Sequence, residues 1–214
     1  MNMSALLDYV QPDVPGCPQA ITMNKIRFAA REFFIRTRLW RHDLFADIDV
    51  ALNTRVYALT PTNPAHESNI AGVLQAWYEG TKIWPRAYPD LVSSFANFNT
   101  ASGRPLYYWF DVDDQISIYP SPSVAAADAL DVLAIQAPKI DSDYFPDQFF
   151  SSWVPWIAHG AIAALMEIPK KPYSDIEGSL YHRAQFDRGV TQALGVVNSG
   201  GTVGVDEEIN TLIG

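Results

Sequence analysis

The first regular pattern in the chain is helical. Between residues 18 and 39, apolar side chains recur every three or four positions, and basic side chains fill the places between them. This spacing predicts an amphipathic helix over residues 18–39, with Pro18 at its first position, where a missing N–H costs nothing. The apolar face is expected to hold Ile21, Ile26, Ala29, Ala30, Phe33 and Phe34.

The period then changes to two, which predicts strands. The first expected strand places Leu44, Ala46, Ile48, Val50 and Leu52 on one face. Others are expected at 55–59, 70–77, 82–84, 104–110, 115–120 and 130–136, with a hairpin turn at residues 79–80 and a short helix at 88–98 that turns Leu91, Val92 and Phe95 inward. The middle of the chain is therefore predicted to be mostly β, with roughly six short strands.

From Pro146 onward the period is helical again. Apolar residues at i, i+4, i+8, i+11 and i+12 form one broad face, which consists of Trp153, Ile157, Ala161, Ala164 and Leu165. Gly160 and its alanine neighbours keep this helix narrow, so that another helix can approach it closely.

An abrupt break follows, at Pro169-Lys170-Lys171-Pro172. Each proline forces the residue before it out of the α region, so one helix ends there and another must begin. Ser174 is expected to cap the second helix, with Glu177 completing a capping box, and Gly195 is expected to end it. The two helices are predicted to form an antiparallel hairpin with a short, rigid turn.

The predicted fold class is α+β. The first helix and the C-terminal hairpin are expected to form a helical bundle domain from residues 1–41 and 143–195, with an antiparallel β domain inserted at 42–142.

Residues 196–214 are expected to form an extended C-terminal tail. The segment has four glycines and few large side chains, so it cannot offset its own ordering entropy. Its end is nevertheless apolar and follows three acids, which favours a docking arm over a frayed terminus. The residues expected to dock are Val205, Asp206, Glu207, Glu208, Ile209, Leu212 and Ile213.

Charge is unevenly distributed along the 214 residues. The net charge is −9, which argues against sequence-independent nucleic-acid binding. Residues 18–41 hold six Lys or Arg and one acid, so the rest of the chain carries −14. Opposed patches of this kind suit self-assembly, although an ordinary solvated helix face would give the same pattern. The high aromatic content, 13%, fits either a surface covered by a partner or a large aromatic core.

The sequence carries no recognisable catalytic or metal-binding motif. Cys17 is the single cysteine, which excludes an intrachain disulfide and fits a reducing cytoplasm. No two histidines have the spacing of a helical metal site, and His159 is expected to be a satisfied polar group among the helices. Asp111, Asp113 and Asp114 lack the glycine and glutamate of a calcium loop, so a hairpin turn is expected there. No cofactor, signal peptide or membrane span is predicted.

Two other functions remain open at this point. The first is a carbohydrate-active enzyme or sugar-binding module, in which Trp77, Trp84 or Trp109 would grip a sugar beside paired carboxylates. The second is a monomeric scaffold protein with a disordered tail.

Several stretches, taken together, resemble the head-to-tail adaptor (connector, or head-completion) proteins of tailed bacteriophages. They cover nearly the whole chain: "IRFAAREFFIRTRLWR" at 26–41, "IWPRAYPDL" at 83–91, "GRPLYYWF" and "ISIYPSP" within 103–122, and "FPDQFFSSWVPWIAHGAIAALMEIPKKPYSD" with "YHRAQFDRGV" within 145–190. The family pattern of a helix with A-x-x-E-F-x-x-x-T, a strand pair ending in Y-P-x-P and a GA-rich helix ending in a Pro-Lys-Pro turn is matched in order.

The resemblance implies a non-enzymatic virion protein of the neck, assembled in the host cytoplasm. It implies a ring, usually of twelve copies, that binds the portal above and a tail or nozzle protein below. DNA would pass through the channel without specific binding, which suits an acidic protein. The C-terminal tail would insert into the portal. From the charge pattern, Arg27, Arg31 and Arg38 are expected to reach acids of a neighbouring copy.

Overall fold

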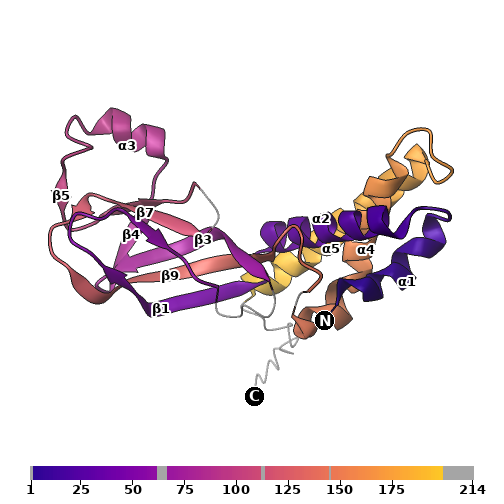
Figure 1. Cartoon of the computed structure of the whole chain (residues 1–214), viewed down its shortest axis with the longest axis horizontal. Helices are drawn as coiled ribbons and strands as arrows, with labels where there is room; N and C mark the ends of the chain where they lie inside the picture. Colours follow the sequence, from indigo (N-terminus) through magenta and orange to yellow (C-terminus); the bar gives the residue numbers. More distant parts are fainter. Residues whose placement is uncertain (1, 62–66, 112–113, 145, 200–214) are drawn as a thin grey trace, which may run out of the picture.

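The computed structural model describes residues 2–61, 67–111, 114–144 and 146–199 of the chain. It shows an elongated molecule with helices at one end and a β-sheet at the other (Figure 1). The predicted α+β class is therefore confirmed. The finer division into a bundle domain, an inserted domain and a tail stays a prediction.

The predicted N-terminal helix is present as α2, Gln19–Thr37. Pro18 is its N-cap, with ψ at 132°, and not its first helical residue as expected. Short turns precede it: η1 (Met3–Leu6), α1 (Leu7–Val10) and η2 (Gln11–Asp13). The prediction that Ile21 is in the core is wrong: it is 36% exposed, because the buried face of α2 runs through Ile26, Ala29, Ala30, Phe33 and Phe34.

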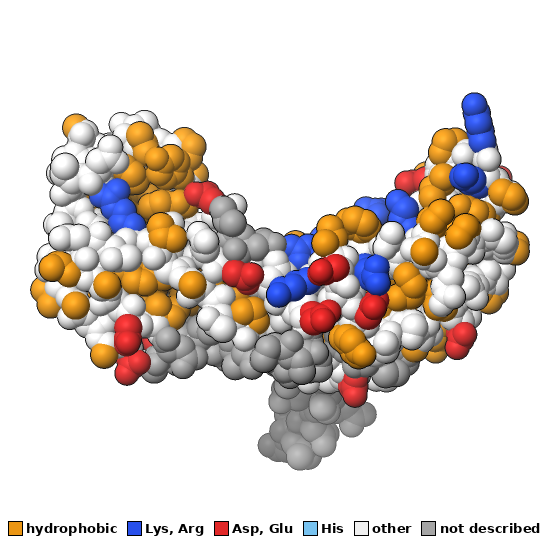
Figure 2. Space-filling view, viewed as in Figure 1, with side chains coloured by type: hydrophobic (Ala, Val, Ile, Leu, Met, Phe, Trp, Pro, Cys, Tyr) orange, Lys and Arg blue, Asp and Glu red, His pale blue; other side chains and the backbone are white. Residues whose placement is uncertain are grey.

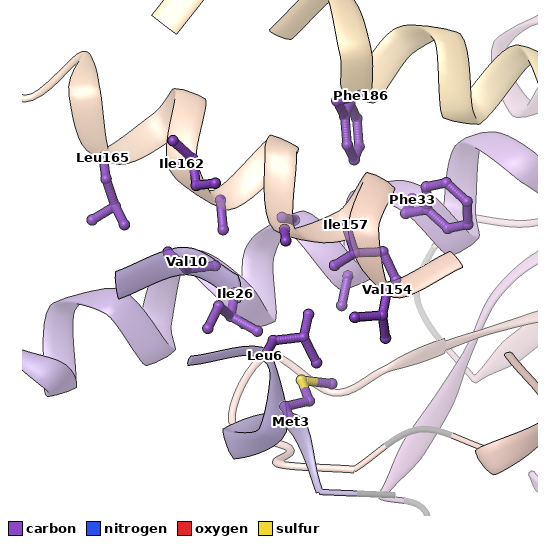
Figure 3. Close-up of a cluster of buried hydrophobic side chains, with 14 of the residues drawn as sticks. Met3, Leu6, Val10, Ile26, Phe33, Val154, Ile157, Ile162, Leu165 and Phe186 are labelled. Atoms are coloured by element: carbon purple, nitrogen blue, oxygen red, sulfur yellow. The ribbon is translucent and has the colours of Figure 1, made fainter. Parts of the chain in front are cut away.

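Helices α4 (Phe150–Met166) and α5 (Ile176–Asn198) run antiparallel and in close contact, as the sequence predicts. Two glycines permit the approach. A Cβ on Gly160 would lie 2.5 Å from the Phe186 ring, and one on Gly189 would lie 2.5 Å from Trp156. Both helices also contact α2. Side chains from η1, α1, α2, α4 and α5 converge on one apolar core, where Phe33, Ile157 and Phe186 have no exposed surface (Figure 3).

The cap of α5 differs from the sequence prediction. Asp175, not Ser174, is the N-cap, and its carboxylate accepts a hydrogen bond from the backbone N–H of Gly178 at 3.0 Å. The Ser174 hydroxyl instead donates to the carbonyl of Ile168 and accepts from the N–H of Lys171. The Ser174 hydroxyl is therefore used within the turn between the helices, and Asp175 caps α5 instead.

Asp175→Ala should lower the free energy of unfolding by about 1 kcal/mol, because it removes the acceptor of an otherwise unpaired helical N–H. Glu177→Ala is the matched control. With Asp175 as the cap, Glu177 is one position short of the place that a capping box requires, so its loss should cost clearly less. Urea denaturation of both variants measures the difference. Equal losses would contradict this assignment of the cap.

Helix α5 continues beyond its predicted end. Gly195 lies inside the helix, and the last helical residue is Asn198. The half-buried Val196 and Val197 extend it, and the Val197 carbonyl accepts a hydrogen bond from Arg41. The N-terminal part of the predicted tail is thus helical, and its residues 200–214 lie outside the described residues.

The β region forms a seven-stranded sheet of order β1-β9-β3-β4-β6-β7-β2 and a separate two-stranded pair, β5-β8. Its longest members are 10, 11 and 13 residues, so the expectation of short strands is wrong for these three. The bounds are β1 Arg41–Val50, β2 Val56–Ala58, β3 Ser68–Tyr78, β4 Thr81–Pro85, β5 Ser102–Gly103, β6 Tyr107–Trp109, β7 Gln115–Tyr119, β8 Ser121–Pro122 and β9 Ala126–Pro138.

The prediction of a purely antiparallel sheet is wrong. Strands β4 and β6 pair in parallel, and so do β5 and β8. The chain between β4 and β6 crosses over through helix α3, Tyr88–Ser94, and a connection of this length is what a parallel pair requires. The predicted hairpin at Glu79-Gly80 is confirmed, and both residues have positive φ, as a tight turn demands.

Two inward positions are predicted wrongly in this region. Leu52 follows the end of β1 and is 55% exposed, and Val92 lies on the open side of α3. Leu91 fills the space beneath α3 instead, in a small aromatic cluster with Phe98 and Tyr119. The side chains of Leu44 and Ala46 lie outside the described ones.

Candidate functional site

The outward side of α2 carries an unusual row of exposed apolar residues. Ile21, Phe28 and Ile35 follow one another at intervals of seven, so they line up along the helix, opposite its buried face. Phe28 is 51% exposed. Lys25 and Arg36 lie along one side of the row, and Arg36 is paired with Glu32 and Asp187. An exposed apolar row on a helix that is otherwise well packed is typical of a surface that a partner covers.

Two of the arginines predicted to contact a neighbour bind groups of their own chain. Arg27 Nη2 lies 2.7 Å from Asp143 Oδ1. Arg31 Nη1 donates to Asn69 Oδ1 at 2.7 Å and to the Pro138 carbonyl at 2.9 Å. Arg27 thus holds α2 against the segment that follows β9, and Arg31 holds it against the ends of β3 and β9.

Arg38, the third arginine of that prediction, lies at the end of α2. Its φ of 54° is left-handed, and its N–H donates to the carbonyl of Phe34, which terminates the helix. Its side chain is exposed. Arg38 lies in the short connection between α2 and β1, where the helical region meets the sheet.

An ion-pair network ties the C-terminal half of α2 to α5. Glu32 accepts from Arg36 at 3.0 Å and from Arg183 at 2.7 Å, and Arg36 also contacts Asp187 at 2.7 Å. All four residues are partly exposed, so the network contributes little stability by itself. It fixes the lateral position of the two helices and neutralises part of the basic excess of α2.

The opposite charge gathers in two segments of the helical region that lie beside each other. Residues 1–17 and 140–152 contain five aspartates and no Lys or Arg. The two segments lie together, because Asn2 forms a β-bridge with Tyr144 and the Met3 N–H donates to the Asp143 carbonyl at 2.6 Å. Tyr9, Ile140 and Tyr144 expose between 41% and 56% of their surface among these acids. We call this surface the acidic edge.

The acidic edge adjoins α2 along one side, where Asp143 pairs with Arg27 and Asp141 lines a pocket with Arg31. In Figure 2 the charged side chains along the lower edge of the helical half are acidic, whereas Lys and Arg side chains follow its hollowed upper edge. In Figure 1, α1 lies below and α2 above in the same view. The charge segregation seen in the sequence is therefore also visible in space, except where Asp143 and Asp141 meet Arg27 and Arg31.

His159 and His182 form a pair between α4 and α5. Their Nδ1 atoms are 2.8 Å apart, so one ring donates and the other accepts, which fits the prediction that His159 is a satisfied polar group. Burial, and then the neighbouring His182, lower the pKa of His159, while Asp13 partly offsets them. Within the described ranges, no group of three or more His, Cys, Asp or Glu could hold a metal ion.

The lowered pKa predicts a pH dependence. The folded chain favours neutral His159, so below about pH 6.5 the unfolded chain binds more protons and stability falls as pH falls. His159→Gln should reduce the loss of unfolding free energy between about pH 7.5 and about pH 5.5, after subtraction of the carboxylate contribution common to both proteins. The same pH-dependent loss in wild type and variant would show that the lowered pKa of His159 does not contribute to stability.

The three tryptophans of the sugar-binding alternative do not share one cleft. Trp109 lines a cleft of about 420 Å³ with Tyr88 and Tyr108, but Trp77 and Trp84 do not line it. Asp111 is the one carboxylate among its described lining residues, and a glycosidase needs two. Trp84 is 57% exposed, and the Lys82 ammonium lies 5.0 Å from its ring centre. This arrangement does not favour the carbohydrate alternative.

The remaining site prediction falls outside the described residues. Val205, Asp206, Glu207, Glu208, Ile209, Leu212 and Ile213 belong to the segment 200–214. Among the residues that are described, no helix is both long and apolar enough to cross a bilayer.

Comparison with protein families shows to which family the chain belongs. The model of the SU10 adaptor protein family matches residues 1–205. The chain belongs to the SU10 adaptor protein family. This is a family of phage head-to-tail adaptors, so the resemblance found in the sequence is confirmed. Comparison with curated proteins finds no match.

Family membership gives the chain a structural role in the neck of the virion, in contact with portal and tail components. The apolar row on α2 and the acidic edge are then surfaces available for assembly. Sequence reasoning found the charge of α2 and missed Tyr9, Ile140 and Tyr144. Their exposure depends on how the two ends of the helical region pack, which no local pattern reveals.

Proposed function

We propose that the chain forms a ring of identical copies beneath the portal, extends the DNA channel and attaches the tail. The match of the SU10 adaptor protein family over residues 1–205 carries this proposal. A ring of twelve copies follows from the resemblance to head-completion proteins. The segregated charges and the exposed apolar row on α2 support self-assembly, since both are surfaces that a single copy leaves uncovered.

The chain acts by shape and charge, without chemistry of its own. An acidic protein lets DNA slide, because a basic wall would hold the phosphates. The ring would therefore be a conduit that does not bind DNA specifically. Assembly would take place in the host cytoplasm before the tail is added, and it needs no cofactor.

The C-terminal segment is proposed to dock on the portal. Helix α5 ends at Asn198, next to Val197, whose carbonyl is bonded to Arg41 at the start of β1, and residues 200–214 follow in the sequence. Asp206, Glu207 and Glu208 precede an apolar tip of Ile209, Leu212 and Ile213. Such an extended segment can bind in a groove of a partner, because its apolar tip has area that the partner can bury.

Self-association is proposed to use the basic face of α2. Arg38 is the exposed arginine of the predicted set, whereas Arg27 and Arg31 position α2 through their own-chain bonds. Arg27 and Arg31 would then act on assembly by holding that face in place.

Sedimentation velocity of the purified chain, alone and with its portal, tests the proposal. We expect a large complex of several copies when portal is present. A monomer in the absence of portal would be compatible, because docking energy can be needed to close the ring. A chain that neither self-associates nor binds portal under any condition would overturn the proposal.

A further inference from the structure

The described part of the chain exposes two assembly surfaces of opposite character. One is the outward face of α2, which has the apolar row of Ile21, Phe28 and Ile35, with Lys25 beside the row and the exposed Arg38 at the C-cap of the helix. The other is the acidic edge, which combines exposed aromatic and aliphatic residues with Asp8, Asp13 and Asp141. The first surface is basic and the second is acidic, and both expose apolar side chains.

The two surfaces cannot cover each other within one protomer. The outward face of α2 lies opposite the residues that pack against α4, whereas the acidic edge lies on the side of α2 that Arg27 faces. Within the protomer, Arg27 of α2 already pairs with Asp143 of this edge, so the two charged regions attract each other. Asp141 of the edge lines a pocket with Arg31, so this side of α2 is already occupied within the protomer and the outward face is not.

We propose that the outward face of α2 in one copy binds the acidic edge of a second copy. This rests on the proposed ring and names the two surfaces that meet in it. A contact between two different surfaces is heterologous, so each copy can bind one neighbour on either side, and the series closes into a ring when the rotation fits. Phe28 of one copy then packs among Tyr9, Ile140 and Tyr144 of the next, with Lys25 and Arg38 facing Asp8 and Asp141.

The charges on this interface fix the relative orientation of two neighbouring copies. Acidic edge against acidic edge would place like charges together, and so would basic face against basic face. Two copies therefore associate in one orientation, which disfavours closed symmetric dimers and favours growth around the ring.

Paired charge reversals test this contact. The first variant carries Lys25→Glu and Arg38→Glu, which makes both surfaces acidic. The second carries Asp8→Lys and Asp141→Lys, which makes both basic. All four side chains are at least partly exposed, so the fold should persist, and circular dichroism checks it. Lys82→Glu with Lys171→Glu changes the net charge as the first variant does but lies outside both surfaces.

Each reversed variant alone should need about a tenfold higher concentration than wild type to form the portal-bound complex, by sedimentation velocity. An equal mixture of the two should assemble like wild type, because alternating copies restore opposite charges at every contact. The Lys82 and Lys171 control should assemble normally.

Other results of this experiment would lead to different conclusions. Reversed variants that assemble like wild type, or a mixture no better than either variant alone, would overturn this pairing of surfaces and leave the ring itself standing. Variants that still self-associate but lose only portal binding would assign the surfaces to the portal and overturn it too. A wild-type chain that never assembles would overturn both this inference and the proposed function.

Discussion

Phe33→Ala should lower the free energy of unfolding by about 3–5 kcal/mol, the usual cost of removing a buried aromatic side chain. Phe33 has no exposed surface and contacts the rings of Phe34, Trp153 and Phe186, which belong to α2, α4 and α5. Its removal leaves a cavity where the three helices meet. A single domain is stabilised by only about 5–15 kcal/mol, so this is a large fraction of the total.

Phe28→Ala is the matched control, on the same helix but on its opposite, outward face. Because Phe28 is half exposed, this change should cost under about 1 kcal/mol of stability while it weakens self-association. Urea denaturation and sedimentation of both variants separate the two effects. Comparable losses of stability at Phe28 and Phe33 would show that the outward face of α2 is a structural surface and not an assembly surface.

Deletion of residues 200–214 should abolish stable attachment to the portal and leave the fold intact. The deleted segment begins after the last helical residue of α5, so no described core contact is removed. It contains the apolar tip and the acids proposed to dock. Co-sedimentation with portal should fall below detection, whereas the urea midpoint and the far-UV spectrum should match wild type.

Substitutions within the full-length chain show which residues of the segment are needed for portal binding. Ile209→Ser, Leu212→Ser and Ile213→Ser together should weaken portal binding strongly, because they remove the apolar area of the tip. The matched control combines three changes at polar residues of the same segment, Thr202→Ala, Asn210→Ala and Thr211→Ala, and it should bind portal like wild type. Portal binding that survives the deletion would show that another surface makes the attachment.

The helices were predictable because their information is local. Apolar residues at intervals of three and four define α2 and α4, and the two prolines at 169 and 172 define the break before α5. The cap of α5 was missed because Ser174 and Asp175 are adjacent and both are good capping residues. The choice between them depends on the turn, in which the Ser174 hydroxyl is already bonded to Ile168 and Lys171.

The topology of the sheet was not predictable in the same way. Period-two patterns located most strands, but they do not say which strands pair. The parallel pairing of β4 with β6 depends on the crossover through α3, and the outward turn of Val92 depends on what α3 covers. These are tertiary facts about partners distant in sequence.

The candidate surfaces were also predictable only in part. The basic excess of residues 18–41 is visible in the sequence, and so is the apolar tip of the tail. Which arginines are occupied within the protomer is not visible, since Arg27 meets Asp143 across 116 positions and Arg31 meets Pro138 across 107. The acidic edge is likewise assembled from two segments that are far apart in the chain.

Electron cryo-microscopy of the chain bound to its portal tests the central claim most directly. The account predicts a closed ring of copies, coaxial with the portal, that continues its channel and places α2 of each copy against the next. Single copies bound at separate places, or a complex without a shared channel, would contradict it.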